Sequence, residues 1–265
     1  MRSLRVAAAT AAFLTLLAVT SAWAMTVQPV IVDLKPGGHN MSSTISVQNT
    51  FTSPLPIGIT IQSLDFDEHG AKPTGKDPGD ILVYPPQALI PPGQTQTFRV
   101  QWVGDPVLAE SKHYYVTVAQ LPVKLPEGQS AIQILYNFQV LVNVGASAGK
   151  ANLSVTNASV AMAEVKPPPG QTAKTPLEKQ PEPEIVVRND SPNYGYLSRA
   201  TIEITEADAS GKQIFDKTLG PQEIQQTVGF GLIGPNTQRR VIIPVALPNA
   251  QGTVKVRVVD AGDQP

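Results

Sequence analysis

The sequence predicts an all-β protein built from two immunoglobulin-like β-sandwich domains in tandem. The 265-residue chain carries 25 prolines and 20 glycines, which separate short runs rich in valine and isoleucine. Within these runs apolar and polar residues alternate, as they do in half-buried strands. Cysteine is absent, so an exported chain of this length must be stabilised by packed apolar cores of about a hundred residues each.

The first 24 residues are predicted to be a secretory signal peptide rather than part of the fold. Arg2 and Arg5 precede an apolar run, Val6–Val19, and Ala22-Trp23-Ala24 matches the small-x-small pattern of a cleavage site. The apolar run is too short to span a bilayer comfortably. We therefore expect a periplasmic protein that does not insert into the membrane.

The first sandwich is expected over residues 25–146, where seven strand candidates match the strand count of an immunoglobulin-like domain. Residues 68–80 are polar and predict a loop. The candidates are Thr26–Leu34, Ser43–Asn49, Pro56–Phe66, Ile81–Tyr84, Gln94–Val103, His113–Val123 and Ala131–Val144.

The second sandwich is expected over residues 151–265, after a small and polar hinge, Gly145–Lys150. An insertion at 166–184 consists mostly of Pro, Lys, Glu, Gln and Thr and predicts a mobile loop. No helical periodicity stands out after the signal peptide. The strand candidates are Asn152–Val160, Ile185–Asn189, Leu197–Glu206, Gln213–Leu219, Gln238–Pro244 and Thr253–Asp260.

Composition and motifs argue against an enzyme or a nucleic-acid-binding protein. The net charge of −1 gives no electrostatic support for binding nucleic acid. His39, His69 and His113 lie far apart and lack metal-ligand spacing. The nucleophile-elbow, zincin, P-loop and dinucleotide motifs are missing. We therefore expect no catalytic residues, no metal and no cofactor.

The segment Ala131–Val144 differs from an ordinary sandwich strand. Its even positions from Ile132 to Val144 are all apolar, and as a strand it would extend more than about 40 Å, well beyond the usual length. One interpretation is a long central strand whose apolar face lies wholly in the core. The other is an edge strand offered to a partner by β-augmentation. The pattern alone leaves both open.

Several local motifs, taken in order, resemble the periplasmic chaperones of the chaperone–usher pilus pathway. The resemblance covers essentially the whole chain after the signal peptide, although no single motif is decisive. The motifs are Tyr84-Pro-Pro-Gln-Ala-Leu-Ile-Pro-Pro-Gly93, Gln94–Val100 with its arginine, Glu110–Val118 running into Leu121-Pro122, Ile132–Val144, Val187-Arg-Asn-Asp190 and Ile233-Gly-Pro-Asn-Thr-Gln-Arg-Arg240.

The resemblance implies a mechanism and a set of partners. Its members are bent, L- or boomerang-shaped, and each lends a strand of the first domain to a pilus subunit that lacks its last strand. On this resemblance the subunit-binding residues are Ile132, Ile134, Tyr136, Phe138 and Val140. The subunit then passes to an outer-membrane usher. A free donor edge also allows the idle chain to associate with itself.

The resemblance further implies a charge network between the domains, formed by Arg99, Glu110 and Asp260. An arginine between two carboxylates would fix the angle of the sandwiches through charge-assisted hydrogen bonds. The alternative is three unrelated solvated charges.

The sequence departs from the family where most members bind the subunit's C-terminal carboxylate. The first strand has no arginine, and the donor strand has Leu141 roughly where a lysine is expected. Either another group binds that terminus, with Gln28, Gln139, Asn143 or a backbone nest as candidates, or this chain no longer chaperones subunits. A structural or adhesive component of a surface pilus is the alternative function.

Overall fold

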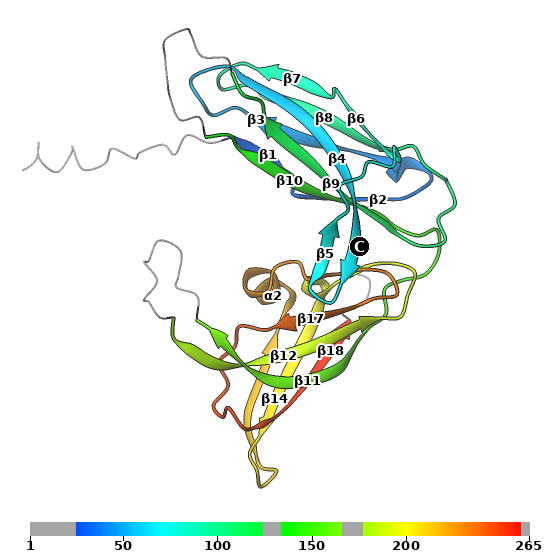
Figure 1. Cartoon of the computed structure of the whole chain (residues 1–265). Coiled ribbons are helices and arrows are strands. Elements are labelled where there is room, and N and C mark those ends of the chain that lie inside the picture. Colours follow the sequence, from blue (N-terminus) through cyan, green and yellow to red (C-terminus); the bar gives the residue numbers. More distant parts are fainter. Residues whose placement is uncertain (1–24, 124–133, 166–176, 261–265) are drawn as a thin grey trace, which may run out of the picture.

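The computed structural model describes residues 25–123, 134–165 and 177–260. Figure 1 shows two β-sandwich bodies that lie at an angle and meet near the tip of strands β4 and β5. The predicted all-β fold class with two sandwiches and a bent shape is confirmed. In the part of the chain that is described, no helix is long and apolar enough to cross a membrane.

The first sandwich consists of two mostly antiparallel sheets that face each other. One sheet has the order β1 (Thr26–Gln28), β3 (Ser42–Gln48), β8 (Thr95–Trp102), β6 (Ile81–Tyr84). The other has the order β2 (Ile31–Leu34), β10 (Asn137–Val144), β9 (Lys112–Gln120), β4 (Leu55–Asp67), β5 (Gly70–Pro73), and β7 (Gln87–Ile90) also pairs with β4.

The core of this sandwich follows the alternation of the sequence. Phe98, Val100 and Trp102 of β8 are fully buried, whereas Arg99 lies on the exposed face. The indole Nε1 of Trp102 donates a hydrogen bond to the carbonyl of Asp105 over 2.9 Å, which satisfies the one polar atom of that ring. Tyr114 packs beside it, with ring centroids 6.3 Å apart.

The second sandwich has its own core, separate from the first. Ile185, Ile202, Ile204, Leu219 and Ile243 are fully buried there. Its elements are β11 (Leu153–Glu164), β12 (Lys179–Asn189), β17 (Gln238–Ile242), β13 (Gly195–Tyr196), β16 (Leu232–Ile233), β15 (Gln213–Leu219), β14 (Ala200–Ala207), β18 (Thr253–Asp260), the 3₁₀ turn η3 (Leu197–Arg199) and the helix α2 (Pro221–Thr227).

The two cores fall on either side of residues 145–150, where the hinge is predicted. The domain boundaries 25–146 and 151–265 stay a prediction.

The structure corrects the sequence prediction at several places. Thr26–Leu34 forms two strands in different sheets, because the chain crosses from one sheet to the other at Pro29. The predicted loop at 68–80 contains β5, and Gln87–Ile90 forms the unpredicted β7. The seven-residue α2 is too short to show an apolar period.

The predicted loop at 166–184 is wrong at its C-terminal end. Lys179–Glu184 belongs to β12 and pairs with the outer half of β11, so that Glu184 lies opposite Ser159. Backbone hydrogen bonds form this hairpin arm, and they do not require apolar side chains. Composition alone could not reveal that pairing. Residues 166–176 lie outside the described part of the chain.

Candidate functional site

The edge of β10 is only partly covered by neighbouring strands. β10 pairs antiparallel with β9 from Asn137 to Val144, but β2 pairs with it in parallel only from Leu141 to Val144. The last backbone contact on that side joins the amide of Leu141 to the carbonyl of Val30 over 3.0 Å. Within the described residues, the segment from Asn137 to Val140 therefore has a strand neighbour on one side only.

The unpaired edge presents backbone donors and acceptors. The carbonyl of Tyr136 accepts a hydrogen bond from the amide of Gln120 at 2.9 Å, so even-numbered residues of this stretch direct their backbone groups toward β9. Odd-numbered residues consequently direct theirs the other way: Leu141 toward β2, and Asn137 and Gln139 toward the open side. An edge of this kind can accept one more strand from another chain.

The predicted donor side chains divide into exposed and buried groups along the strand. Ile134 is 71% exposed, and Tyr136 and Phe138 are half-buried against the rim of the first core. Val140 is 1% exposed, with its side chain inside that core and its backbone just before the stretch that β2 covers. Its assignment as a subunit-binding side chain stays a prediction. Ile132 lies outside the described residues.

A cleft with a volume of about 1110 Å³ lies between the sandwiches, lined by the end of β2 and by the chain that follows β10 from Gly145 onward. Asp33 of β2 is the polar centre of one wall. Its Oδ1 accepts hydrogen bonds from Tyr196 Oη at 2.7 Å and Asn143 Nδ2 at 3.0 Å, and its Oδ2 accepts one from Arg199 at 2.7 Å. Asp33 and Asn143 belong to the first sandwich, and Tyr196 and Arg199 to the second, so this cluster joins them.

The protein environment keeps Asp33 charged. Burial alone would raise the pKa of its carboxyl, but hydrogen bonds from Tyr196, Asn143, Tyr194 and Arg199 outweigh that effect and lower the pKa below its ordinary value. The Arg199 guanidinium also lies 4.5 Å from the centre of the Tyr196 ring, a cation–π contact. The Arg199 side chain is 66% exposed, and its remaining N–H groups can reach into the cleft.

The cluster continues inward to a buried histidine. Asn143 Nδ2 donates to Tyr196 Oη at 2.6 Å as well as to Asp33, so Asn143 Oδ1 must accept from His113 Nδ1, 2.6 Å away. His113 Nε2 then accepts from Ser111 Oγ at 3.0 Å. Burial lowers the pKa of His113 to about 4, so the ring is neutral at neutral pH. We call these six residues the interdomain cluster; they are Asp33, Ser111, His113, Asn143, Tyr196 and Arg199.

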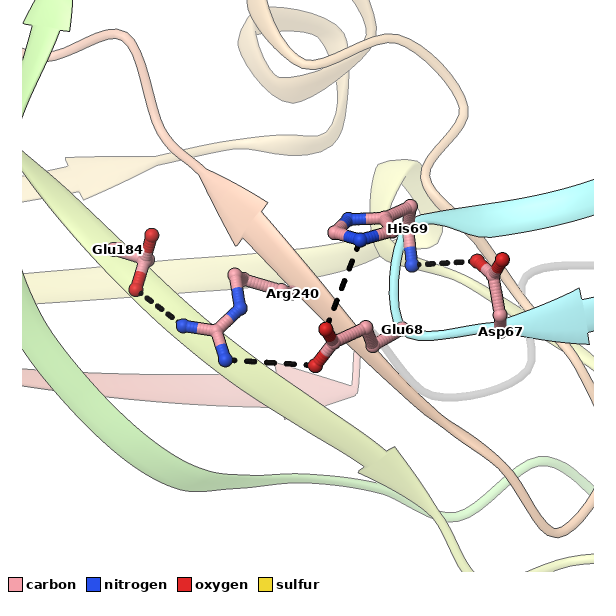
Figure 2. A network of polar contacts seen from close by, with 5 residues as sticks. All are labelled: Asp67, Glu68, His69, Glu184 and Arg240. Atoms are coloured by element: carbon pink, nitrogen blue, oxygen red, sulfur yellow. Dashed lines mark hydrogen bonds and ion pairs between the residues drawn. The ribbon is translucent and has the colours of Figure 1, made fainter.

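A second contact between the sandwiches is made by the β4–β5 hairpin. Figure 2 shows Arg240 of β17 between Glu68 at the hairpin tip and Glu184 of β12, with N···O distances of 3.5 and 2.7 Å. The His69 ring lies beside the Glu68 carboxylate, and the His69 backbone amide donates a hydrogen bond to Asp67 Oδ1 at 2.8 Å. The amide of Arg240 also donates to the carbonyl of Glu68 at 2.7 Å. These ionic side chains lie at the surface.

Next to its tip, this hairpin packs tightly against the second sandwich through Phe66. A Cβ atom on Gly234 would lie 2.5 Å from the ring of Phe66. The same ring also contacts His113 in a T-shaped arrangement with ring centroids 4.8 Å apart. The two interdomain contacts therefore meet at Phe66.

The three residues of the predicted charge network lie on different elements. Arg99 donates to Ser42 Oγ at 3.2 Å on the exposed face of β8. Glu110 accepts from Asn236 Nδ2 of the second sandwich at 2.8 Å, so it does take part in the interface, with a different partner. Asp260 ends β18, opposite Ala200, and its side chain lies outside the described set. The joint network stays a prediction.

The residues predicted as alternatives for binding the subunit's terminal carboxylate differ in their exposure. Gln28 and Gln139 are exposed, whereas Asn143 is fully buried and uses both ends of its amide within the interdomain cluster. Sequence reasoning missed Asp33, Tyr196 and Arg199. The available signal was the pair of polar residues, Asp33 and Asn143, that interrupt otherwise apolar runs. Among the described residues, no group of three His, Asp or Glu side chains could hold a metal ion.

No protein-family model and no curated protein sequence matches the chain. Solved structures with a similar fold are chaperones of pilus assembly. The CsuC–CsuE chaperone–tip adhesion subunit complex from archaic Csu pili of Acinetobacter baumannii is 10% identical with a TM-score of 0.47, covering 86% of this chain and 94% of that one.

The SafB chaperone of Salmonella enterica in complex with the SafA pilin is 14% identical with a TM-score of 0.46, covering 85% and 86% of the two chains. The class 5 fimbriae chaperone CfaA is 13% identical with a TM-score of 0.48, covering 88% and 98%. At these identities and TM-scores, the function has to be argued from the chain's own residues.

Proposed function

We propose that this chain is a periplasmic chaperone of pilus assembly that caps an incomplete, immunoglobulin-like pilus subunit by lending it the exposed part of β10. The capped subunit is then delivered to an outer-membrane usher. The observation that carries the proposal is the open edge from Asn137 to Val140, which continues an apolar stripe that begins outside the sandwich. The motifs that resemble the chaperone–usher family support the same mechanism.

The donor side chains of this proposal are Ile134, Tyr136 and Phe138, with Ile132 as a fourth predicted residue. Ile134 is exposed, and the two aromatic rings cover the rim of the core without entering it fully. Tyr136 leans on Phe51, with ring centroids 5.9 Å apart. Insertion of such side chains into an open groove removes apolar area from water, which stabilises the complex by roughly 25 cal/mol per Å².

Arg199 is the group we propose for the subunit's terminal carboxylate. Asp33 makes part of the cleft wall acidic, and the cations that line the same cleft are Lys35, Lys150 and Arg199. We choose Arg199 among them because one of its nitrogens is already oriented by Asp33 and its side chain is 66% exposed. Its free N–H groups can form charge-assisted hydrogen bonds with a second carboxylate.

The test is capture of a co-expressed pilus subunit from the same gene cluster, measured by co-purification from the periplasm. Ile134→Asp should abolish capture, because a charge would have to enter the apolar groove of the subunit. Leu89→Asp is the matched control, since Leu89 is an equally exposed leucine (67%) on β7. Capture that survives Ile134→Asp, or that is lost equally with Leu89→Asp, would refute strand lending through β10.

The cleft anchor is tested separately with Arg199→Gln. We expect a subunit affinity reduced about tenfold or more, since a hydrogen bond to a charged group contributes roughly 1.5–3 kcal/mol. Removing the last carboxylate of the subunit by C-terminal amidation should then cause no further loss. An affinity unchanged by Arg199→Gln contradicts the anchor but leaves the strand-lending proposal standing.

A further inference from the structure

One histidine is enclosed by groups from both sandwiches. His113 is 4% exposed and has Phe66 of its own sandwich on one side, with ring centroids 4.8 Å apart. Tyr194 of the second sandwich also contacts the His113 ring in a T-shaped arrangement, with ring centroids 5.1 Å apart. Separation of the sandwiches would remove Tyr194 and Tyr196 and bring water to the ring.

We propose that His113 makes the contact between the two sandwiches sensitive to acid, so that protonation of its ring favours an open state in which Tyr194 and Tyr196 have withdrawn. In the closed state described above, the interdomain cluster holds one domain angle and one cleft shape. This device acts on the chain alone and does not depend on whether β10 is lent to a subunit.

The neutral ring fits the closed state because every polar atom around it has a defined partner. Nδ1 donates to Asn143 Oδ1, and Nε2 accepts from Ser111 Oγ. A protonated ring would have to donate at Nε2 as well, so the Ser111 hydroxyl would have to turn its hydrogen away. The added charge would also lie in a site that is only 4% exposed, where it would lose most of its hydration.

The charged and titratable groups around His113 do not offset the cost of burying its cation. Asp33 attracts a positive charge and raises the pKa of His113, yet burial lowers that pKa more, to about 4. Asp33 is moreover already paired with Arg199. Tyr194 and Tyr196 stay neutral, since burial raises the pKa of both phenols. The neighbouring pocket between the sandwiches adds Asp65, Asp80, Glu110 and Lys112.

The size of the effect follows from linkage. In the open state the pKa of His113 returns toward its ordinary 6.5, whereas in the closed state it is about 4. The ratio of closed to open molecules therefore falls at most tenfold for each pH unit between these values, about 300-fold in total. A closed state favoured by less than this factor at neutral pH becomes the minor state in acid.

The other two histidines provide internal controls. His39 lies in the short turn η2 (His39–Met41), and His69 lies at the hairpin tip; both are exposed. Their ring contacts differ from those of His113: neither has an aromatic neighbour from the other sandwich among the described residues. A transition caused by His113 must therefore be absent after His113→Gln and unchanged after His39→Gln.

The experiment measures the distance between the sandwiches as a function of pH. Because the chain contains no cysteine, Thr97→Cys on β8 and Gln226→Cys on α2, both exposed positions, can carry a fluorescent donor and acceptor. We expect energy transfer to change between pH 6.5 and 4 in the parent and in the His39→Gln chain. His113→Gln should show no change in that window.

The histidine Cε1–H signals in NMR spectra of the unlabelled parent chain give an independent readout that needs no folded variant. The signal that titrates lowest should share its midpoint with the distance change. Energy transfer that stays constant while this histidine titrates overturns the proposal, and so does an identical transition in His113→Gln.

Discussion

The two contacts that join the sandwiches are built on opposite principles. The interdomain cluster buries His113, Asn143 and Tyr196 and supplies each polar atom with a partner. The Glu68–Arg240–Glu184 contact consists of ion pairs at the surface, where Arg240 is 43% exposed. A buried polar network loses several kcal/mol when one member is removed, whereas an exposed ion pair contributes little. The buried contact should therefore determine the domain angle.

The largest effect is expected for Asn143→Leu. The change removes three hydrogen bonds and leaves the His113 Nδ1–H without an acceptor inside the interface. We expect the free energy of unfolding to fall by about 3–5 kcal/mol. Urea denaturation followed by Trp102 fluorescence measures it, because the other tryptophan, Trp23, lies in the predicted signal peptide.

The matched control for that change is Asn137→Leu, at an exposed position on the same strand. It should change stability by less than about 0.5 kcal/mol. Equal losses for the two variants would mean that the buried network is no more important than the surface of β10.

Acid should weaken the buried contact first. The pKa of His113 is lowered from 6.5 to about 4 in the folded chain, so the unfolded chain binds more protons between these values and stability rises with pH across this window. Lowering the pH from 7 to 4 should cost about 3 kcal/mol. Asp33 acts in a lower window: its pKa is lowered, so its contribution is complete above its ordinary pKa and lost only in stronger acid.

Urea denaturation at pH 7, 6, 5 and 4 checks the upper window, and further points at pH 3 and 2 check the lower one. The free energy of unfolding of His113→Gln should change less with pH than that of the parent chain between pH 6.5 and 4. Below pH 4 the two chains should change in parallel. A parent chain whose stability does not change across the upper window would contradict a buried neutral histidine.

Gly234→Ala should have an intermediate effect where the two contacts meet. The new methyl group would press on Phe66, whose ring also contacts His113, and overpacking of this kind costs about 1–3 kcal/mol. Faster amide hydrogen exchange in the β4–β5 hairpin is the expected readout. Gly220→Ala serves as the control, because a Cβ there meets no atom within 4 Å; an equal acceleration in both would refute the packing argument.

The smallest effect is expected for Arg240→Ala at the hairpin tip. Loss of the ion pairs with Glu68 and Glu184 should lower the free energy of unfolding by less than about 1 kcal/mol, and by less still in high salt. Arg257→Ala, which removes an exposed ion pair with Glu203 inside the second sandwich, should give a similar value. A loss above about 2 kcal/mol for Arg240→Ala alone would reverse the ranking of the two contacts.

The sequence predicts most strands because their alternation is local. Ile45, Val47, Phe98 and Val100 face the core as their spacing requires. Two of the missed strand segments depend on partners outside their own local pattern: β7 owes its pairing to β4, and the polar start of β12 owes its pairing to β11. No local pattern records those neighbours.

The candidate site could be predicted only where it depends on a local sequence pattern. The apolar stripe of β10 is visible in the sequence, yet the point where it turns from exposed to buried depends on β2, more than a hundred residues away in the sequence. Asp33, Asn143 and Tyr196 meet across that distance and across the domain boundary. Their individual residue types gave no sign that they form one cluster.

The crossing of the chain between sheets at Pro29 has a consequence for anything that pairs with β10. β1 lies in one sheet and β2 in the other, and β2 occupies the side of β10 from Leu141 onward, with Val30 at its start. A foreign strand can advance along β10 only until it meets this backbone. The alignment of that strand is thus limited by a physical stop within the first sandwich, independently of which side chains the strand carries.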